Sequence, residues 1–463
     1  MDIVLIIIQS LAALLGFLTA ALSLLFFRQL HWPAPALWFL KIYASALSPL
    51  LLLIGVFSTI VGLATDSVSI SLIGVYNVII FSIHIYKVSR PAASSTGFEK
   101  AFGPHWYKGI KSDQRKYFLS RRIQLKLPAV PDPQLEQNIS FATIPDTGRQ
   151  LLCDVWQPPS TITPSGLAFI YLHGSAFYFL DKDFNTRPFF RHLAAQGHVI
   201  MDVAYRLFPE TNIMGMVNDV KRAIVWMKEN AGSYGVNPSR IVVGGGSAGG
   251  HLALLAAYTI NNLQFTPKGL EGKDTSVCAV ISLYGSNDLE ALYYHTNQHL
   301  TSRSIPGGPK KSVPTKMPGW IIKKMGEDYH RLGMDKDFEK TGTLAPLLGG
   351  LPDECPERYA FFSPATHVHS ACPPTLLIHD EHDIMAPVKT TRLLYTRLVE
   401  RKVLTVMHIL PQTDHGFDLI LPGISPSAHT AFYDVERFLA LMMTNQKVEK
   451  KAMIGDMALQ YDG

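Results

Sequence analysis

The sequence predicts an α/β fold in which a mostly parallel β-sheet carries helices on both faces and transmembrane helices precede it. From about residue 138 onward, short apolar segments alternate with helical patterns, which is typical of a parallel sheet covered on both sides. A glycine-flanked serine, Ser247, stands between one such segment and a helical pattern. Long uncharged stretches fill most of the first 89 residues.

Three N-terminal stretches carry no charge: Ile3–Phe27, Ile42–Thr65 and Val68–Tyr86. Each is close to the ~20 residues that span a hydrocarbon core. A buried core helix or a signal peptide is the alternative for any one of them. The first is a poor signal peptide because no basic residue precedes its long apolar run. The third is the weakest span because it contains Asn77 and His84. We therefore expect about three transmembrane helices.

The charges that flank these stretches predict the orientation of the chain in the membrane. Residues 87–126 contain ten lysines and arginines against two acidic residues. The first loop holds Arg28 and Lys41, whereas the second holds only Asp66. Because basic loops remain in the cytosol, we expect a multi-pass protein, of the endoplasmic reticulum, whose main domain is cytosolic. The basic segment suits anionic membrane lipids, and no nucleic-acid partner is expected.

Changes in composition divide the chain into consecutive parts. We expect a membrane segment at 1–89, a linker and membrane-proximal cap at 90–137, an α/β catalytic domain at 138–445 and a polar tail at 446–463. Glycine, proline and lysine turns interrupt the alternation at 290–359, so this segment is predicted to be a lid-like insertion.

Periodicity predicts eight strands and five principal helices in the α/β domain. The strands are expected at Ser140–Ile144, Leu151–Trp156, Leu167–Leu172, His198–Val203, Arg240–Val243, Cys278–Tyr284, Thr375–Ile378 and Val403–Leu410. The helices are expected at Thr186–Gln196, Met214–Ala231, Ser247–Tyr258, Val388–Glu400 and Ser427–Met443.

The run around Ser247 fits the pattern G-x-S-x-G between a short apolar strand and a helix. This is the context of a nucleophile elbow, a strained turn that exposes a serine hydroxyl. The pattern alone is weak, because common residues at ordinary frequencies produce it by chance in about one chain of this length in five. The alternative is a serine without a catalytic role in a glycine-rich turn. Candidate partner residues elsewhere in the sequence are needed to choose between the two interpretations.

Partners for Ser247 follow in the order acid, then histidine, as they do in sheets of this kind. Asp383 lies in the polar turn after the strand that begins at Thr375, and it competes with Asp380 and Glu381 of the same turn. His415 follows the last strand and precedes Gly-Phe; an ordinary loop histidine is the alternative. Both lie past the carboxyl ends of strands, where sites form in open α/β sheets. We predict that Ser247, Asp383 and His415 form a catalytic triad.

An oxyanion-binding loop is expected after the strand that ends at Leu172. There the sequence continues with His173 and the small residues Gly174, Ser175 and Ala176. Backbone N–H groups of these small residues, together with that of Ala248, would donate to the oxygen of an attacked carbonyl. A loop without this role is the alternative. This chemistry implies neither a metal nor an organic cofactor, and the four cysteines show no metal-ligand spacing.

Several ordered motifs together resemble a known family. His173-Gly-Ser-Ala, Tyr205-Arg-Leu-Phe-Pro-Glu210 and Gly244-Gly-Gly-Ser-Ala-Gly-Gly250 are similar to signatures of the hormone-sensitive-lipase group of α/β-hydrolases, which includes carboxylesterases and arylacetamide deacetylases. Phe361-Phe-Ser-Pro364 and His379–Asp383 extend the likeness. The resemblance implies Ser247 as nucleophile, His415 as general base and then acid, and Asp383 as its orienter.

The chain departs from this family in three places. Ser175 and Ala176 replace glycines, which puts wide tolerance for bulky alcohol groups in doubt. Gly246 replaces the Asp that commonly precedes the nucleophile. Three N-terminal helices replace a single anchor, so the lumenal location of membrane-bound relatives does not transfer. The run from Tyr205 is expected to be a structural turn in which Arg206 and Glu210 can pair.

These observations predict a membrane-anchored serine hydrolase that cleaves carboxylic esters of apolar substrates, such as lipid esters or secondary metabolites, through an acyl-enzyme on Ser247. The alternative is a catalytically idle α/β-hydrolase that binds a ligand or acts as a pathway scaffold. The plant gibberellin receptor resembles the family but lacks the general base, whereas this chain has His415. The oligomeric state does not follow from the sequence.

Overall fold

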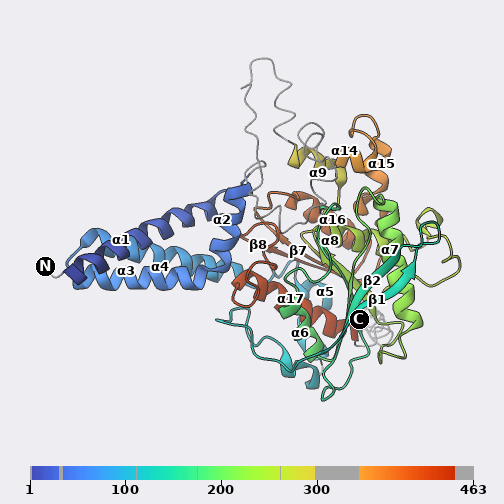
Figure 1. Ribbon diagram of the computed structural model, residues 1–463, viewed down its shortest axis with the longest axis horizontal. Coiled ribbons are helices and arrows are strands. Elements are labelled where there is room, and N and C mark those ends of the chain that lie inside the picture. Colours follow the sequence, from blue (N-terminus) through green and yellow to red (C-terminus); the bar gives the residue numbers. More distant parts are fainter. Residues whose placement is uncertain are drawn as a thin grey trace, which may run out of the picture.

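The computed structural model describes residues 3–30, 35–110, 112–174, 176–260, 262–297 and 344–443. It consists of an elongated group of N-terminal helices and a rounded α/β domain (Figure 1). Ser175, the polar tail 446–463 and the middle of the predicted insertion lie outside the described residues.

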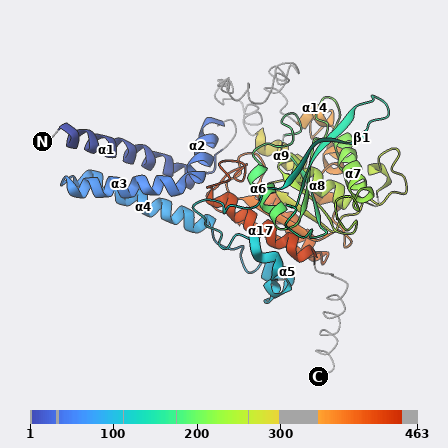
Figure 2. The ribbon, with the colours of Figure 1, turned by 60° about the horizontal axis from the view of Figure 1, so that its bottom comes forward.

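Four helices form the N-terminal group: α1 (Ile3–Ser23, continued by η1, Leu24–Phe27), α2 (Pro35–Ala46), α3 (Ser48–Ala64) and α4 (Val68–Val88). Two helices are long and apolar enough to cross a membrane, or three if the bent pair α2–α3 counts as one span. Because α1 and α4 approach the α/β domain and α3 leads away from it, α2 lies at the domain end (Figures 1 and 2).

The prediction of one continuous helix at Ile42–Thr65 is wrong, because the chain bends by 78° between α2 and α3. The cause is Pro49, which stands in the first turn of α3. A proline lacks a backbone N–H, and its ring clashes with the carbonyl four residues earlier, so α2 ends at Ala46. As a result α2 lies across the end of the bundle and contacts α17 (Pro426–Met443) of the α/β domain.

Small residues allow α3 and α4 to pack closely. A Cβ added to Gly62 would lie 2.4 Å from the Ser71 backbone nitrogen, and one added to Gly74 would lie 2.4 Å from that of Thr59. Such small-residue contacts are typical of helices that associate in lipid. The polar residues Asn77 and His84 are buried, and Asn77 donates to the Gly16 carbonyl. The features that weaken the third apolar stretch therefore face the interior of the bundle.

The α/β domain contains one eight-stranded sheet in the order β1-β2-β4-β3-β5-β6-β7-β8. Strands β3 to β8 are mutually parallel, whereas β2 pairs antiparallel with both β1 and β4. The strands are β1 (Gln134–Thr143), β2 (Gln150–Gln157), β3 (Ala168–Leu172), β4 (Val199–Val203), β5 (Ile241–Gly246), β6 (Ala279–Leu283), β7 (Thr375–Asp380) and β8 (Thr405–Leu410). All eight predicted strands are confirmed within a few residues, except that β1 begins six residues early, at Gln134.

Helices cover both faces of the sheet. One apolar core joins a face of the sheet to α7 (Ile213–Glu229), α8 (Ala248–Tyr258) and α16 (Val388–Glu400). The other core joins the opposite face to α6 (Arg187–Ala195) and α17. The five predicted helices are confirmed. Because β3 to β8 are parallel, their carboxyl ends lie at one edge of the sheet.

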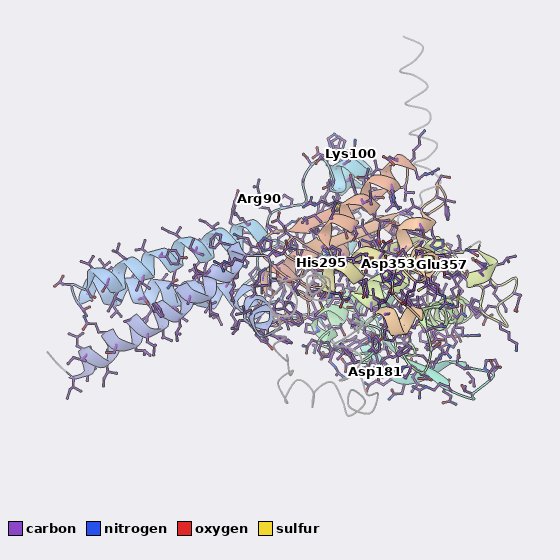
Figure 3. The ribbon with its side chains drawn as sticks, turned by 90° about the horizontal axis from the view of Figure 1, so that it is seen from above. Arg90, Lys100, Asp181, His295, Asp353 and Glu357 are labelled. Carbon is purple, nitrogen blue, oxygen red and sulfur yellow. The ribbon has the colours of Figure 1, made fainter. Side chains whose placement is uncertain are left out.

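The segment after the N-terminal helices packs on the α17 layer. It forms α5 (Phe98–Phe102), η2 (Trp106–Gly109) and η3 (Asp113–Tyr117). Phe98, Ile110 and Leu119 are buried in the core beside α17. Figure 3 shows Arg90 at the junction of the N-terminal helices with the α/β domain and Lys100 further along, on α5.

Short helices border the predicted insertion: α9 (Leu289–Thr296), α14 (Leu344–Leu348) and α15 (Pro356–Phe361). The short turns η4 (Leu263–Phe265) and η6 (Pro364–His367) complete the described elements. His295 of α9 lies on the same side of the domain as Asp353 and Glu357 (Figure 3). Its Nε2 lies 3.1 Å from the Asp383 carbonyl oxygen, so α9 contacts the turn that carries the predicted acid.

Candidate active site

Ser247 lies in a sharp turn between β5 and α8, with φ 52° and ψ −121°. The flanking glycines allow the turn to approach β3 closely. A Cβ at Gly245 would lie 2.2 Å from the Leu172 carbonyl oxygen, and one at Gly249 would lie 2.0 Å from the same atom. Any larger residue at either position would collide with this backbone. The predicted nucleophile elbow therefore has the expected strand, strained turn and helix.

His415 contacts both other members of the predicted triad. Its Nε2 lies 2.8 Å from Ser247 Oγ, and its Nδ1 lies 2.8 Å from Asp383 Oδ2. A single neutral tautomer satisfies both contacts, because Nδ1–H donates to the carboxylate while Nε2 accepts from the hydroxyl. The residues come from three loops at the carboxyl edge of the sheet, after β5, β7 and β8. This chain of hydrogen bonds can remove a proton from Ser247 as its oxygen attacks a carbonyl.

Backbone N–H groups of its own turn hold the Asp383 carboxylate in place. Its Oδ1 accepts hydrogen bonds from the backbone N–H groups of Met385 and Ala386, each at 2.7 Å. Its Oδ2 also lies 3.2 Å from Nε2 of His379. Burial alone would raise the pKa of Asp383, but the facing His415 and His379 rings hold it well below its ordinary value. Asp383 is therefore ionised at neutral pH and oriented toward His415.

The rival acids of the same turn do not contact His415. Asp380 is buried at the end of β7, and neither of its carboxylate oxygens has a hydrogen-bond partner among the described groups. Burial, with the charges of Asp383 and Asp414, raises the pKa of Asp380 well above its ordinary value, which does not favour a charged carboxylate facing His415. Glu381 is exposed.

His379, Asp380 and Asp383 place possible metal-ligand atoms within 4.8 Å of one another. Asp383 Oδ2 is already shared between His379 and His415. A cation held here would take this carboxylate from His415, so the group suits hydrogen bonding better than metal binding.

The predicted oxyanion loop lies beside the elbow because Leu172 and Gly245 are paired across β3 and β5. A Cβ at Gly174 would lie 3.2 Å from the Ser247 Cβ, so the backbone of Gly174 adjoins the nucleophile. The N–H of Ala248 opens α8 and has no acceptor within the helix. Ala176 lies in the left-handed region at φ 46°, where an alanine is strained and a glycine would not be. Ser175 lies outside the described residues.

Tyr284 explains why glycine precedes Ser247 in this chain. A Cβ at Gly246 would lie 2.7 Å from the Tyr284 hydroxyl oxygen. That hydroxyl donates to Asp418, whose pKa is raised to about 6 by burial. The Tyr284 ring also packs edge-on against His415, with centroids 4.7 Å apart. Tyr284 and Asp418 thus occupy the space that an Asp at position 246 would need.

The predicted pairing of Arg206 with Glu210 is wrong. Arg206 binds Asp219 of α7 at 2.7 Å, and Glu210 lies 3.4 Å from Arg149. Asp219 is fully buried and needs a cation more than the exposed Glu210 does. The adjacent Tyr205 donates to the His173 carbonyl at 2.8 Å, so this run supports the oxyanion loop.

Three residues near the site were not foreseen from the sequence. Asp414 precedes His415 and pairs with Lys41 of α2 at 2.9 Å. Trp38 of α2 donates from Nε1 to the His415 carbonyl at 3.1 Å. The sequence contains one local signal, which is that Asp414 adjoins His415. Lys41 and Trp38 could not be linked to this loop, because they lie more than 370 positions away from Asp414 and His415.

Two family descriptions match consecutive parts of the chain. BD-FAE matches residues 153–318, and the prolyl oligopeptidase family matches residues 334–440. The chain has the α/β-hydrolase fold. The eight-stranded sheet, the elbow at Ser247 and these matches agree on this point.

Bacterial esterases are among the proteins similar to this chain. "Probable carboxylic ester hydrolase LipM" of Mycobacterium tuberculosis is 30% identical over 301 residues, which cover 65% of this chain and 60% of LipM. "Esterase LipQ" of the same organism is 29% identical over 328 residues, 69% of this chain and 68% of LipQ. A solved thermophilic esterase of Thermogutta terrifontis is 20% identical, with a TM-score of 0.48, and covers 69% of this chain and 95% of its own. The chain thus spans less than two thirds of the length of LipM.

Proposed function

We propose that this hydrolase cleaves carboxylic esters through an acyl-enzyme on Ser247. The observation that carries the proposal is the continuous hydrogen-bonded chain from Ser247 Oγ through His415 to Asp383, with both bonds at 2.8 Å. The names of LipM and LipQ support ester hydrolysis, and the motif runs support membership of the hormone-sensitive-lipase group. An idle binding protein would have no need to retain this geometry.

In the proposed reaction, Ser247 Oγ attacks the ester carbonyl while His415 Nε2 takes its proton. Backbone N–H groups of Gly174, Ser175, Ala176 and Ala248 would stabilise the negative oxygen of the tetrahedral intermediate. The alcohol leaves with the proton from His415, and an ester links the acyl group to Ser247. Water then attacks this ester, with His415 again as base, and releases the carboxylic acid. Asp383 stabilises the imidazolium that forms in both steps.

Active-site labelling tests the proposal directly. A fluorophosphonate reacts only with an activated serine, so the detergent-solubilised full-length protein should be labelled at Ser247. Ser247→Ala should abolish the label, whereas Ser239→Ala, an exposed serine just before β5, should keep it. A wild-type protein that is not labelled, or a label that survives Ser247→Ala, would contradict the proposal.

We also propose that the N-terminal helices anchor the enzyme in a membrane and that its substrates partition into lipid. Large apolar side chains are exposed on these helices, among them Ile3, Phe17, Ile60, Leu63 and Leu72. In water such a surface is unfavourable, whereas in lipid it has no cost. Because α2 contacts both the bundle and the His415 loop, the site lies close to the membrane surface. Esters of lipids or of apolar secondary metabolites fit this location.

Three spans would place the catalytic domain in the cytosol, because the basic first loop and this domain share one end of the bundle. The sequon at Asn138 provides a test, because its side chain is exposed in β1. We expect no glycan at Asn138 in cells of a eukaryotic host, and no mobility change after endoglycosidase treatment. A long hydrophilic loop that carries a sequon, inserted at the Asp66 turn between α3 and α4, should be glycosylated and serves as the lumenal control. Glycan at Asn138 would contradict the orientation.

A further inference from the structure

Helix α2 is joined to the loop that carries His415 by an ion pair and a hydrogen bond. Lys41 Nζ lies 2.9 Å from Asp414 Oδ2, and neither side chain is exposed to solvent. The same ammonium donates to the Arg28 carbonyl at 3.1 Å. One turn earlier in α2, Trp38 Nε1 donates to the carbonyl of His415 itself at 3.1 Å. Two side chains of the N-terminal helices thus hold consecutive residues of the catalytic loop.

Asp414 transmits the contact to both predicted catalytic loops. Its Oδ1 accepts from the backbone N–H of Ile384 at 2.8 Å and from that of His415 at 2.9 Å. Ile384 follows Asp383 directly, so this one carboxylate oxygen ties the acid turn to the histidine loop. The other oxygen is bound by Lys41. The Asp414 carboxylate therefore helps to hold Asp383 and His415 in contact, and its counter-ion is Lys41 of α2.

Lys41 is the cation that this arrangement requires. Burial raises the pKa of Asp414, and Lys41 opposes that rise. Without Lys41, Asp414 would be a buried carboxylate beside the Asp383 charge, which is strongly unfavourable. The carboxylate would have to shift toward water or take up a proton, and either change alters the bonds that position Ile384 and His415. Displacement of a catalytic group by about 1 Å can lower a rate by about 10²-fold.

We propose that Lys41 and Trp38 are positioning residues for His415, so that the N-terminal helices complete the active site as well as anchor it. This inference rests on the proposed esterase function, because its measured effect is on catalysis. Both contacts involve the His415 loop. Lys41 pairs with Asp414, the residue before His415, and the Trp38 indole donates to the His415 carbonyl.

The test compares full-length variants in detergent micelles with a short soluble ester, p-nitrophenyl butyrate. Lys41→Met should lower kcat by about 10- to 10²-fold and leave KM near the wild-type value, because substrate contacts do not change. The rate constant for fluorophosphonate labelling of Ser247 should fall in parallel. The double variant Lys41→Met/Asp414→Asn should recover most of kcat, because a neutral amide at position 414 needs no counter-ion and its oxygen can still accept from Ile384 and His415.

A second buried lysine supplies the matched control. Lys221 of α7 is also buried and donates from Nζ to the Thr259 carbonyl at 2.8 Å, just beyond the end of α8 that lies far from Ser247. Lys221→Met should lower the melting temperature but leave kcat near wild type. Loss of kcat in Lys41→Met alone then reports positioning and not general instability.

Two results would overturn the inference: a kcat for Lys41→Met equal to that of Lys221→Met, or a double variant as slow as Lys41→Met. If Lys41→Met does not fold, Trp38→Phe decides, because it keeps an aromatic ring and removes only the bond to His415. Its kcat should fall several-fold, and an unchanged kcat overturns the inference. A wild-type protein that is not labelled would overturn the proposed function itself, whereas a labelled wild type with unaffected variants contradicts only the role of α2.

Discussion

Replacement of His415 by alanine is expected to lower kcat for a simple ester by on the order of 10³-fold or more. His415 Nε2 is within 2.8 Å of Ser247 Oγ, and an alcohol hydroxyl without a base is a poor nucleophile. The variant should still fold, because the hydrogen bonds of the His415 backbone to Trp38 and Asp414 remain. Its kcat and melting temperature would be measured together.

A histidine remote from the site provides the control for this experiment. His105→Ala removes an exposed imidazole of the membrane-proximal segment and should leave kcat unchanged. A His415→Ala protein that keeps near-normal turnover would rule out the assigned base, and with it the proposed acyl-enzyme route.

Asp383→Asn is expected to lower kcat by about 10⁴-fold while leaving the fold intact. An amide at this position can donate to His415 Nδ1, which favours the tautomer with the proton on Nε2. That tautomer faces Ser247 with a donor and cannot accept its proton. The amide oxygen can still accept from Met385 and Ala386, so the turn should persist. Steady-state kinetics and the labelling rate at Ser247 would measure the loss.

Glu381→Gln is the matched control, because Glu381 is an exposed carboxylate two residues away in the same turn. It should leave kcat within about twofold of wild type, because Glu381 does not contact His415 and exposed substitutions usually change the stability by no more than about 0.5 kcal/mol. Equal losses in the two variants would mean that the turn, and not the Asp383 carboxylate, controls the rate.

The core of the fold follows from local patterns in the sequence. Strands such as β3 and β4 are five consecutive buried apolar or small residues with few exceptions, so periodicity and length identify them. The elbow, the acid turn and the histidine loop are likewise local, because each follows directly on a strand. Their meeting point follows from the parallel arrangement of these strands.

Contacts between distant segments could not be predicted in the same way. Lys41 and Asp414 are 373 positions apart, and nothing in either neighbourhood specifies the other. Arg206 has an acidic residue four positions away in Glu210, yet it binds Asp219, thirteen positions away, because that carboxylate is buried. Pro49 did signal the break between α2 and α3, but the long apolar run concealed it.

The crosswise position of α2 has a consequence for shortened forms of the enzyme. A protein that began at residue 90 would retain Ser247, Asp383 and His415 but lose Lys41 and Trp38, and Asp414 would lie at a newly exposed apolar face. If Lys41 and Trp38 position His415 as proposed, such a protein would hydrolyse esters more slowly than the full-length chain. The smallest unit that preserves the proposed active site would therefore include helix α2.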